Sequence, residues 1–121
     1  MGLPTRIGVV GPCKSGKSTL IRGLEAHGYQ AIQIAQEHSF APEMWQRIAK
    51  PDLLIYLHCD YASTVARGLD WSEAEYAQQG PRLAHARQHA DFEISTDDPP
   101  PEEVLEAVLE FLGEAGAETG D

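Results

Sequence analysis

Residues 11–18, Gly-Pro-Cys-Lys-Ser-Gly-Lys-Ser, combine the residue types and the spacing that hold phosphate groups. Glycines let the backbone turn so that successive N–H groups point into one concavity, and a helix that begins there adds its partial positive charge. Lys17 is placed to neutralise the outer phosphates of a nucleotide, and the Ser18 hydroxyl is placed to bind Mg²⁺. We therefore predict that the following residues bind a nucleotide: Gly11, Pro12, Cys13, Lys14, Ser15, Gly16, Lys17, Ser18 and Thr19.

The spacing Gly11-x4-Gly16-Lys17-Ser18 fits the Walker A pattern. The β-branched run at 6–10 predicts a buried strand before it, and the apolar spacing at 18–28 predicts a helix after it. A strand before and a helix after are the structural context that this motif requires. The alternative is a glycine-rich turn that joins a strand to a helix by chance.

Strands and helices alternate along the rest of the chain. Further strands are predicted at 29–36, 52–60 and 91–95, and further helices at 42–49, 63–68, 73–90 and from Pro101 onward. Gly80-Pro81 is expected to interrupt the helical stretch 73–90. This alternation predicts an α/β fold with a parallel sheet of about four strands and right-handed crossovers. Residues 1–112 are expected to form one domain, with a lid region at 63–90 and a flexible acidic tail at 113–121.

Several residues with possible roles fall at the carboxyl ends of the predicted strands, where parallel sheets bind ligands. Gly11, Glu37 and Asp60 all lie at that edge. Asp60 suits the N-cap of the helix that follows better than a place near magnesium. The stretch Ala-Lys-Pro-Asp at 49–52 superficially suggests a guanine-binding element, but such an element follows a strand and this one precedes one.

The stretch Pro-Asp-Leu-Leu-Ile-Tyr-Leu-His-Cys-Asp at 51–60, followed by Arg67, resembles the P-loop nucleoside and nucleotide kinases, in particular the thymidylate and deoxynucleoside kinases. The resemblance implies a three-layer P-loop NTPase fold that binds ATP, or a related triphosphate, with Mg²⁺. It also implies that Arg67 opens the lid and stacks on adenine, and that residues 95–98 border the adenine.

The resemblance assigns catalytic roles to further residues. In these kinases a carboxylate with a nearby arginine ends the strand beside the phosphate loop; here Glu37 supplies the carboxylate, and His38 stands where the arginine is expected. Glu37 is then the base or the magnesium partner, unless it is an ordinary acid at a strand end. Arg82 and Arg87 are expected to be lid cations that act with Lys17 on the transferred phosphoryl group, unless they are solvated helix charges.

The helices on which nucleotide kinases hold their acceptor are missing, because the second strand starts directly after the first helix. Phe40, Met44 and Trp45 offer a substitute acceptor wall, unless they simply pack a helix on the sheet. The leading hypothesis is a small kinase-like phosphotransferase with an unidentified small acceptor. The alternative is a nucleotide-binding switch or slow ATPase that signals through a protein partner, and a homodimer is left open.

Composition narrows the class of protein further. The net charge is -10, and residues 91–121 hold eleven acidic and no basic residues, which argues against a nucleic-acid partner. The apolar run at 53–57 is too short to cross a bilayer, and no signal peptide is evident. A cytoplasmic protein is expected, in which Cys13 and Cys59 are reduced rather than a redox switch. The five histidines show no metal-ligand spacing.

Overall fold

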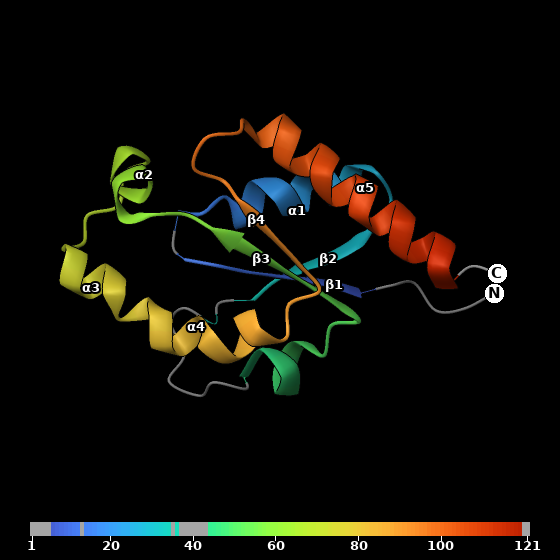
Figure 1. Ribbon diagram of the computed structural model, residues 1–121, viewed down its shortest axis with the longest axis horizontal. Helices are drawn as coiled ribbons and strands as arrows, with labels where there is room; N and C mark the ends of the chain where they lie inside the picture. Colours follow the sequence, from blue (N-terminus) through green and yellow to red (C-terminus); the bar gives the residue numbers. More distant parts are fainter. Residues whose placement is uncertain (1–5, 13, 35, 37–43, 120–121) are drawn as a thin grey trace.

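A single parallel sheet organises the chain. The computed structural model describes residues 6–12, 14–34, 36 and 44–119, and in this part four strands pair in the order β2-β1-β3-β4 (Figure 1). The strands are β1 (Arg6–Val10), β2 (Gln30–Gln33), β3 (Leu53–His58) and β4 (Phe92–Ser95). The predicted α/β class and the predicted four-stranded parallel sheet are confirmed, and β2 lies at an edge as its half-buried pattern predicts.

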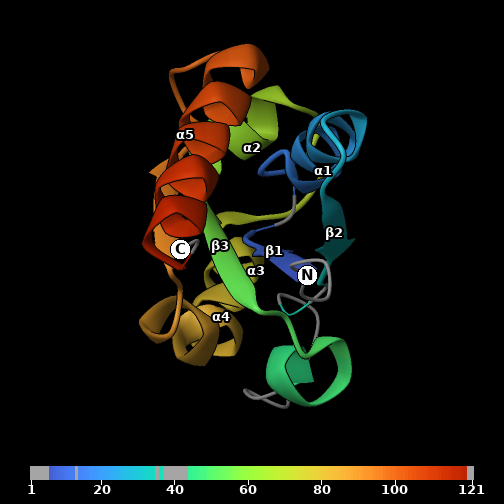
Figure 2. The same cartoon turned by 90° about the vertical axis from the view of Figure 1, so that its right-hand side faces the viewer.

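Helices cover both faces of the sheet, so the fold has three layers (Figure 2). On one face lie α1 (Lys17–Ala26) and α5 (Pro101–Thr119), and on the other lie η2 (Trp45–Ala49) and α4 (Gln79–Gln88). β3 supplies both cores because its side chains alternate between the two faces. Ile55 and Leu57 belong to the α1–α5 core, whereas Leu54 and Tyr56 belong to the other core.

Two short helices follow β3 at the carboxyl end of the sheet, namely α2 (Tyr61–Ala66) and α3 (Glu73–Ala77). Asp60 caps α2, since its side chain accepts a hydrogen bond of 2.8 Å from the Ser63 N–H. Ser72 and Glu75 form the reciprocal capping box of α3. The N-cap predicted at Asp60 is confirmed.

Three predicted helix boundaries differ from the structure. The helix predicted at 42–49 is a π-helix over Trp45–Ala49, and Lys50 ends it in the left-handed region at φ 48°. The break between α3 and α4 lies at Gln78, so Gly80-Pro81 falls in the first turn of α4. Proline costs no hydrogen bond there, because first-turn N–H groups have no partner within the helix. α5 continues to Thr119, beyond the predicted end at 112.

Within the described part of the chain, no helix combines the length and the apolar character needed to cross a bilayer. The cytoplasmic location and the homodimer stay predictions.

Candidate functional site

The strand order places a crevice at one point of the sheet. β2 lies on one side of β1 and β3 lies on the other, so the order reverses between β1 and β3. In open parallel sheets, ligands bind beyond the carboxyl ends of the strands at such a reversal. The loop 11–16 follows β1 and residues 59–60 follow β3, so both segments border this position.

The loop after β1 turns tightly before it enters α1. Ser15 N–H donates to the carbonyl oxygen of Pro12 at 3.1 Å, and Lys14 and Gly16 have φ angles of 67° and 99°. A Cβ atom at Gly11 would lie 2.7 Å from the backbone oxygen of Leu57 and 2.9 Å from Ser15 Oγ. Glycine is therefore required at position 11, because the loop passes so close to the end of β3.

Lys17 and Ser15 are the two polar side chains buried in this loop. Lys17 is 4% exposed, and its Nζ donates to the carbonyl oxygens of Gly11 and Pro12 at 2.9 and 3.0 Å. Ser15 is fully buried, and among the described residues its Oγ has no hydrogen-bond partner. A buried hydroxyl without a partner is unusual, because burial removes its hydrogen bonds to water and no hydrogen bond within the protein replaces them. An ammonium group and an unsatisfied hydroxyl thus lie together at the N-terminus of α1.

The predicted magnesium ligands are only partly described. Ser18 Oγ donates to Gln33 Oε1 at 2.8 Å, so its hydroxyl is engaged with the end of β2. Glu37 and Cys13 lie outside the described residues. In the ranges that the structure covers, no three His, Cys, Asp or Glu side chains cluster in a way that suits a metal ion.

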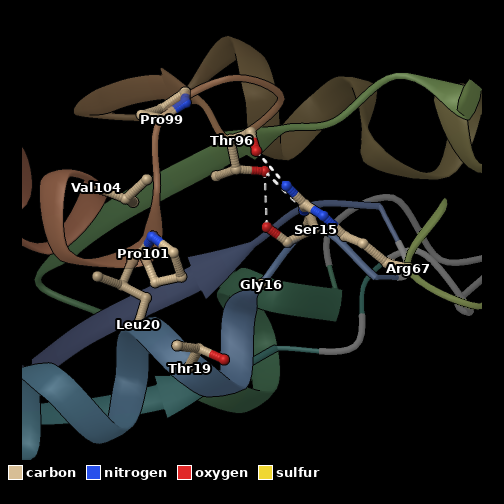
Figure 3. A pocket seen from close by; sticks show the side chains of 9 residues that line it. All are labelled: Ser15, Gly16, Thr19, Leu20, Arg67, Thr96, Pro99, Pro101 and Val104. Atoms are coloured by element: carbon tan, nitrogen blue, oxygen red, sulfur yellow. Dashed lines mark hydrogen bonds between the residues drawn. The ribbon is translucent and has the colours of Figure 1, made fainter. Parts of the chain in front are cut away.

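A cavity of about 270 Å³ opens beside the loop (Figure 3). Arg67 lies at its rim, where its Nη1 donates to Lys14 O at 3.0 Å and its guanidinium also donates to the carbonyl oxygen of Thr96. Thr96 Oγ1 in turn donates to Ser15 O at 2.8 Å. The cavity is lined by Ser15, Gly16, Thr19, Leu20, Arg67, Thr96, Pro99, Pro101 and Val104.

Thr96 falls within the range 95–98 that the resemblance placed beside the adenine, but the sequence predicted no role for its own side chain. It follows β4 directly, it is 5% exposed, and it connects the phosphate loop to Arg67. The sequence does contain a signal for Thr96: it is a polar residue directly after a predicted parallel strand, and such residues lie at the ligand-binding edge of the sheet.

A second hollow of about 330 Å³ lies at the carboxyl edge of the sheet, and two of its lining side chains, His58 and Arg87, are paired with Glu93. His58 Nε2 lies 2.6 Å from Glu93 Oε1, and Arg87 Nε lies 3.4 Å from the same oxygen. The hydrogen bond from His58, assisted by Arg87, lowers the pKa of Glu93. The hollow is lined by Pro12, Tyr56, His58, Cys59, Asp60, Tyr76, Arg87 and Asp97.

Backbone contacts hold the rest of this second hollow in place. Tyr76 donates its hydroxyl to the carbonyl oxygen of Cys59, and burial raises the pKa of Tyr76 to about 12. Burial also raises the pKa of the Cys59 thiol, although a hydrogen bond with Thr96 and the charge of Arg67 oppose this shift. Cys59 is a buried free thiol, so at neutral pH it is protonated and unreactive.

The structure gives contacts for several of the remaining predicted residues. Trp45 is 5% exposed and packs in the core between η2, α4 and the sheet, so it forms no acceptor wall. The Arg82 carbonyl oxygen accepts a hydrogen bond of 3.0 Å from Gln36 Nε2, and Arg87 is held at Glu93. Phe40 and His38 lie outside the described residues.

No family model matches the chain, and no curated protein matches it. Among solved structures, a response regulator receiver domain protein (CheY-like) from Methanospirillum hungatei JF-1 is similar to it. The sequence identity is 16% and the TM-score is 0.45, over 96% of this chain and 99% of that chain. The likeness is too distant to supply an activity, and none is taken from it.

The family and the activity predicted from the sequence are contradicted. The order β2-β1-β3-β4 equals the first four strands of the flavodoxin-like order 2-1-3-4-5, and no family model or curated protein supports the resemblance to the P-loop kinases. We therefore withdraw the resemblance to P-loop kinases, the kinase-like or ATPase activity and the nucleotide-switch alternative. The physical reason is that a glycine-rich turn into a helix binds anions in several α/β folds, so it predicts a local geometry and not a family.

The catalytic roles of Lys17, Glu37, Arg82 and Arg87 depend on the withdrawn activity and stay predictions. The binding roles of residues 11–19 stay predictions as well, and the adenine-stacking role of Arg67 falls with the resemblance that implied it.

Proposed function

We propose that this protein binds a small phosphorylated ligand, with a phosphate group in the loop 11–18 and the rest of the ligand in the cavity beside Arg67. The observation that carries the proposal is the buried, unpartnered Ser15 Oγ beside the buried Lys17 ammonium. A phosphate oxygen would accept from the hydroxyl and would neutralise the ammonium at the same time.

The backbone around these two side chains supports the same ligand class. α1 has ten residues and no side-chain cap at its N-terminus. The N–H groups of a first helical turn have no partner within the helix, and the helix dipole favours a negative charge there. The carbonyl oxygens of Gly11 and Pro12 hold Lys17 Nζ in the ligand-free loop. A phosphate would replace these neutral acceptors with charged ones, which bind an ammonium more strongly.

The neighbouring cavity defines the rest of the ligand. Leu20, Val104 and the two prolines give it apolar walls, while Arg67 and Thr96 add polar groups at the end nearest the loop. A phosphate ester with a compact, largely apolar group suits this arrangement better than free phosphate does. A Mg²⁺ ion that accompanies the ligand would recruit the Ser18 hydroxyl away from Gln33.

Binding is tested by thermal unfolding and calorimetry with inorganic phosphate, pyrophosphate, adenosine, AMP and ATP, each with and without Mg²⁺. Ligand at a hundred times its Kd stabilises the native state by about 2.7 kcal/mol, so the shift in Tm will be several degrees. Phosphorylated ligands are expected to raise Tm, and adenosine is not.

Two variants make this test specific to the site. Lys17→Ala is expected to abolish the shift in Tm, whereas Arg22→Ala, which removes an exposed positive charge from the same helix, is expected to keep it. The proposal fails if no phosphorylated ligand raises Tm, or if Lys17→Ala responds as the unmodified protein does.

A further inference from the structure

A tryptophan and two histidines meet on the face of the sheet opposite α1, away from the proposed phosphate site. Trp45 of η2 donates its indole Nε1–H to Nδ1 of His85 on α4 at 3.0 Å. An indole N–H can only donate, so Nδ1 of His85 must carry a lone pair. His85 is therefore neutral in this structure, with its proton on Nε2.

His85 cannot take up a second ring proton without losing the hydrogen bond from Trp45. The added proton would go to Nδ1, where it would face the indole N–H, and two donors repel each other. Histidine is the side chain that takes up a proton near neutral pH. The hydrogen bond between Trp45 and His85 is therefore present when His85 is neutral and is lost as pH falls.

The surroundings of His85 do not stabilise an added proton. His89, four residues later on α4, stacks on His85 with a centroid separation of 4.4 Å and an interplanar angle of 30°. Its Nδ1 lies 2.9 Å from the His85 carbonyl oxygen and so donates to it. Within the described ranges neither histidine forms an ion pair with a carboxylate. Among the described residues, the aromatic rings that contact His85 are Trp45 from η2 and His89 from its own helix.

The four-residue spacing of His85 and His89 also suits a pair of metal ligands, which the sequence analysis overlooked. The bond from Trp45 argues against that use. His85 would have to bind a metal through Nε2, and it holds its proton there as long as Trp45 donates to Nδ1.

A second set of hydrogen bonds also joins η2 to α4 among the described residues. The Trp45 backbone N–H donates to Gln36 Oε1 at 2.8 Å, and Gln36 Nε2 donates to Arg82 O at 3.0 Å. Gln36 is fully buried. η2 itself is a π-helix of five residues, too short to hold its shape without tertiary contacts.

We propose that the contact between η2 and α4 is a pH-sensitive latch, in which His85 is the proton acceptor and the Trp45–His85 hydrogen bond is the element that opens. Loss of this one bond loosens η2 and leaves the hydrogen bonds of Gln36 and the sheet in place.

The test follows the emission of Trp45 and the hydrogen exchange of the η2 amides between pH 8 and pH 5, in a Trp71→Phe background that leaves one tryptophan. We expect a single transition in emission. After correction for the intrinsic pH dependence of amide exchange, we expect the protection of the η2 amides to be roughly fivefold lower at the acid end, as the loss of one hydrogen bond predicts. His85→Asn keeps an acceptor near the position of Nδ1 but cannot titrate, and it is expected to remove the transition.

Either of two results would overturn the latch. One is a transition of unchanged size and midpoint in His85→Asn. The other is a nitrogen NMR spectrum of the unmodified protein at pH 8 that shows the His85 proton on Nδ1 rather than on Nε2. The NMR measurement needs no variant, so it decides the question even if His85→Asn does not fold.

Discussion

The two hollows at the carboxyl edge of the sheet share no lining residue and differ in how their polar groups are satisfied. Beside the loop, Ser15 Oγ is buried without a hydrogen-bond partner among the described residues, and Arg67 lines an apolar cavity. In the second hollow, Glu93 receives both His58 and Arg87. A buried polar group without an internal partner is the feature on which we propose the first hollow as the binding site, whereas Glu93 of the second hollow is satisfied internally.

The largest effect is expected from the glycine that brings the loop close to β3. Gly11→Ala places a Cβ atom 2.7 Å from a backbone oxygen that cannot move freely, and we expect a loss of about 2–3 kcal/mol in the free energy of unfolding. Gly80→Ala is the matched control, because its Cβ meets nothing within 4 Å and alanine in a helix gains about 0.5 kcal/mol. Urea denaturation of both variants measures the contrast. Equal stabilities would mean that the loop does not approach β3 so closely.

The next prediction compares one arginine from each hollow, Arg67 from the first and Arg87 from the second. Arg67→Ala removes the guanidinium at the mouth of the cavity and its bonds to Lys14 O and Thr96 O. We expect the Kd of a phosphorylated ligand to rise about tenfold, the worth of one charged hydrogen bond. Arg87→Ala is expected to change that Kd by less than about twofold, because its partner is Glu93. Calorimetric titration of both variants decides which hollow binds the ligand, and a larger effect from Arg87 would reverse the assignment.

Ser15→Ala should change stability and binding in opposite directions. Removal of the unpartnered hydroxyl spares the ligand-free protein its desolvation cost, so the free energy of unfolding is expected to rise by about 1 kcal/mol. The same change removes a donor to the phosphate, so the affinity for the ligand is expected to fall about fivefold. Thermal unfolding with and without ligand measures both effects. A loss of stability in the ligand-free protein would show that the hydroxyl has a structural partner.

The smallest effect belongs to the second hollow and depends on pH. The folded-state pKa of Glu93 is lowered from its usual 4.5, chiefly by the His58 hydrogen bond. Its contribution to stability is therefore fully present above that value and is lost as pH falls through the folded-state pKa. The pair is partly exposed, so we expect no more than a few tenths of a kcal/mol. Glu93→Gln should flatten the fall in Tm below pH 4.5, and an unchanged acid slope would show that the pair contributes nothing.

The sequence predicted the order of strands and helices because each element carries a local signal. The β-branched run before Gly11, the capping box at Ser72 and the apolar stripe after Pro101 all depend on neighbours in sequence. The contacts that complete the proposed site join residues that are far apart in the sequence. Thr96 bonds to the loop across 81 residues of chain, and Trp45 bonds to His85 across 40. No local pattern specifies such pairs, so the anion-binding turn was predictable while its supports were not.

The hydroxyl of Thr96 has a consequence for the kinetics of binding. It lies within hydrogen-bond distance of both Ser15 O and His58 O, and so fastens the loop to the ends of β3 and β4. A loop that is already fixed in its bound shape loses little conformational entropy when the ligand arrives. Related ligands should then enter this site at similar rates and differ mainly in how long they stay. Residence time, more than rate of capture, would separate a good ligand from a poor one.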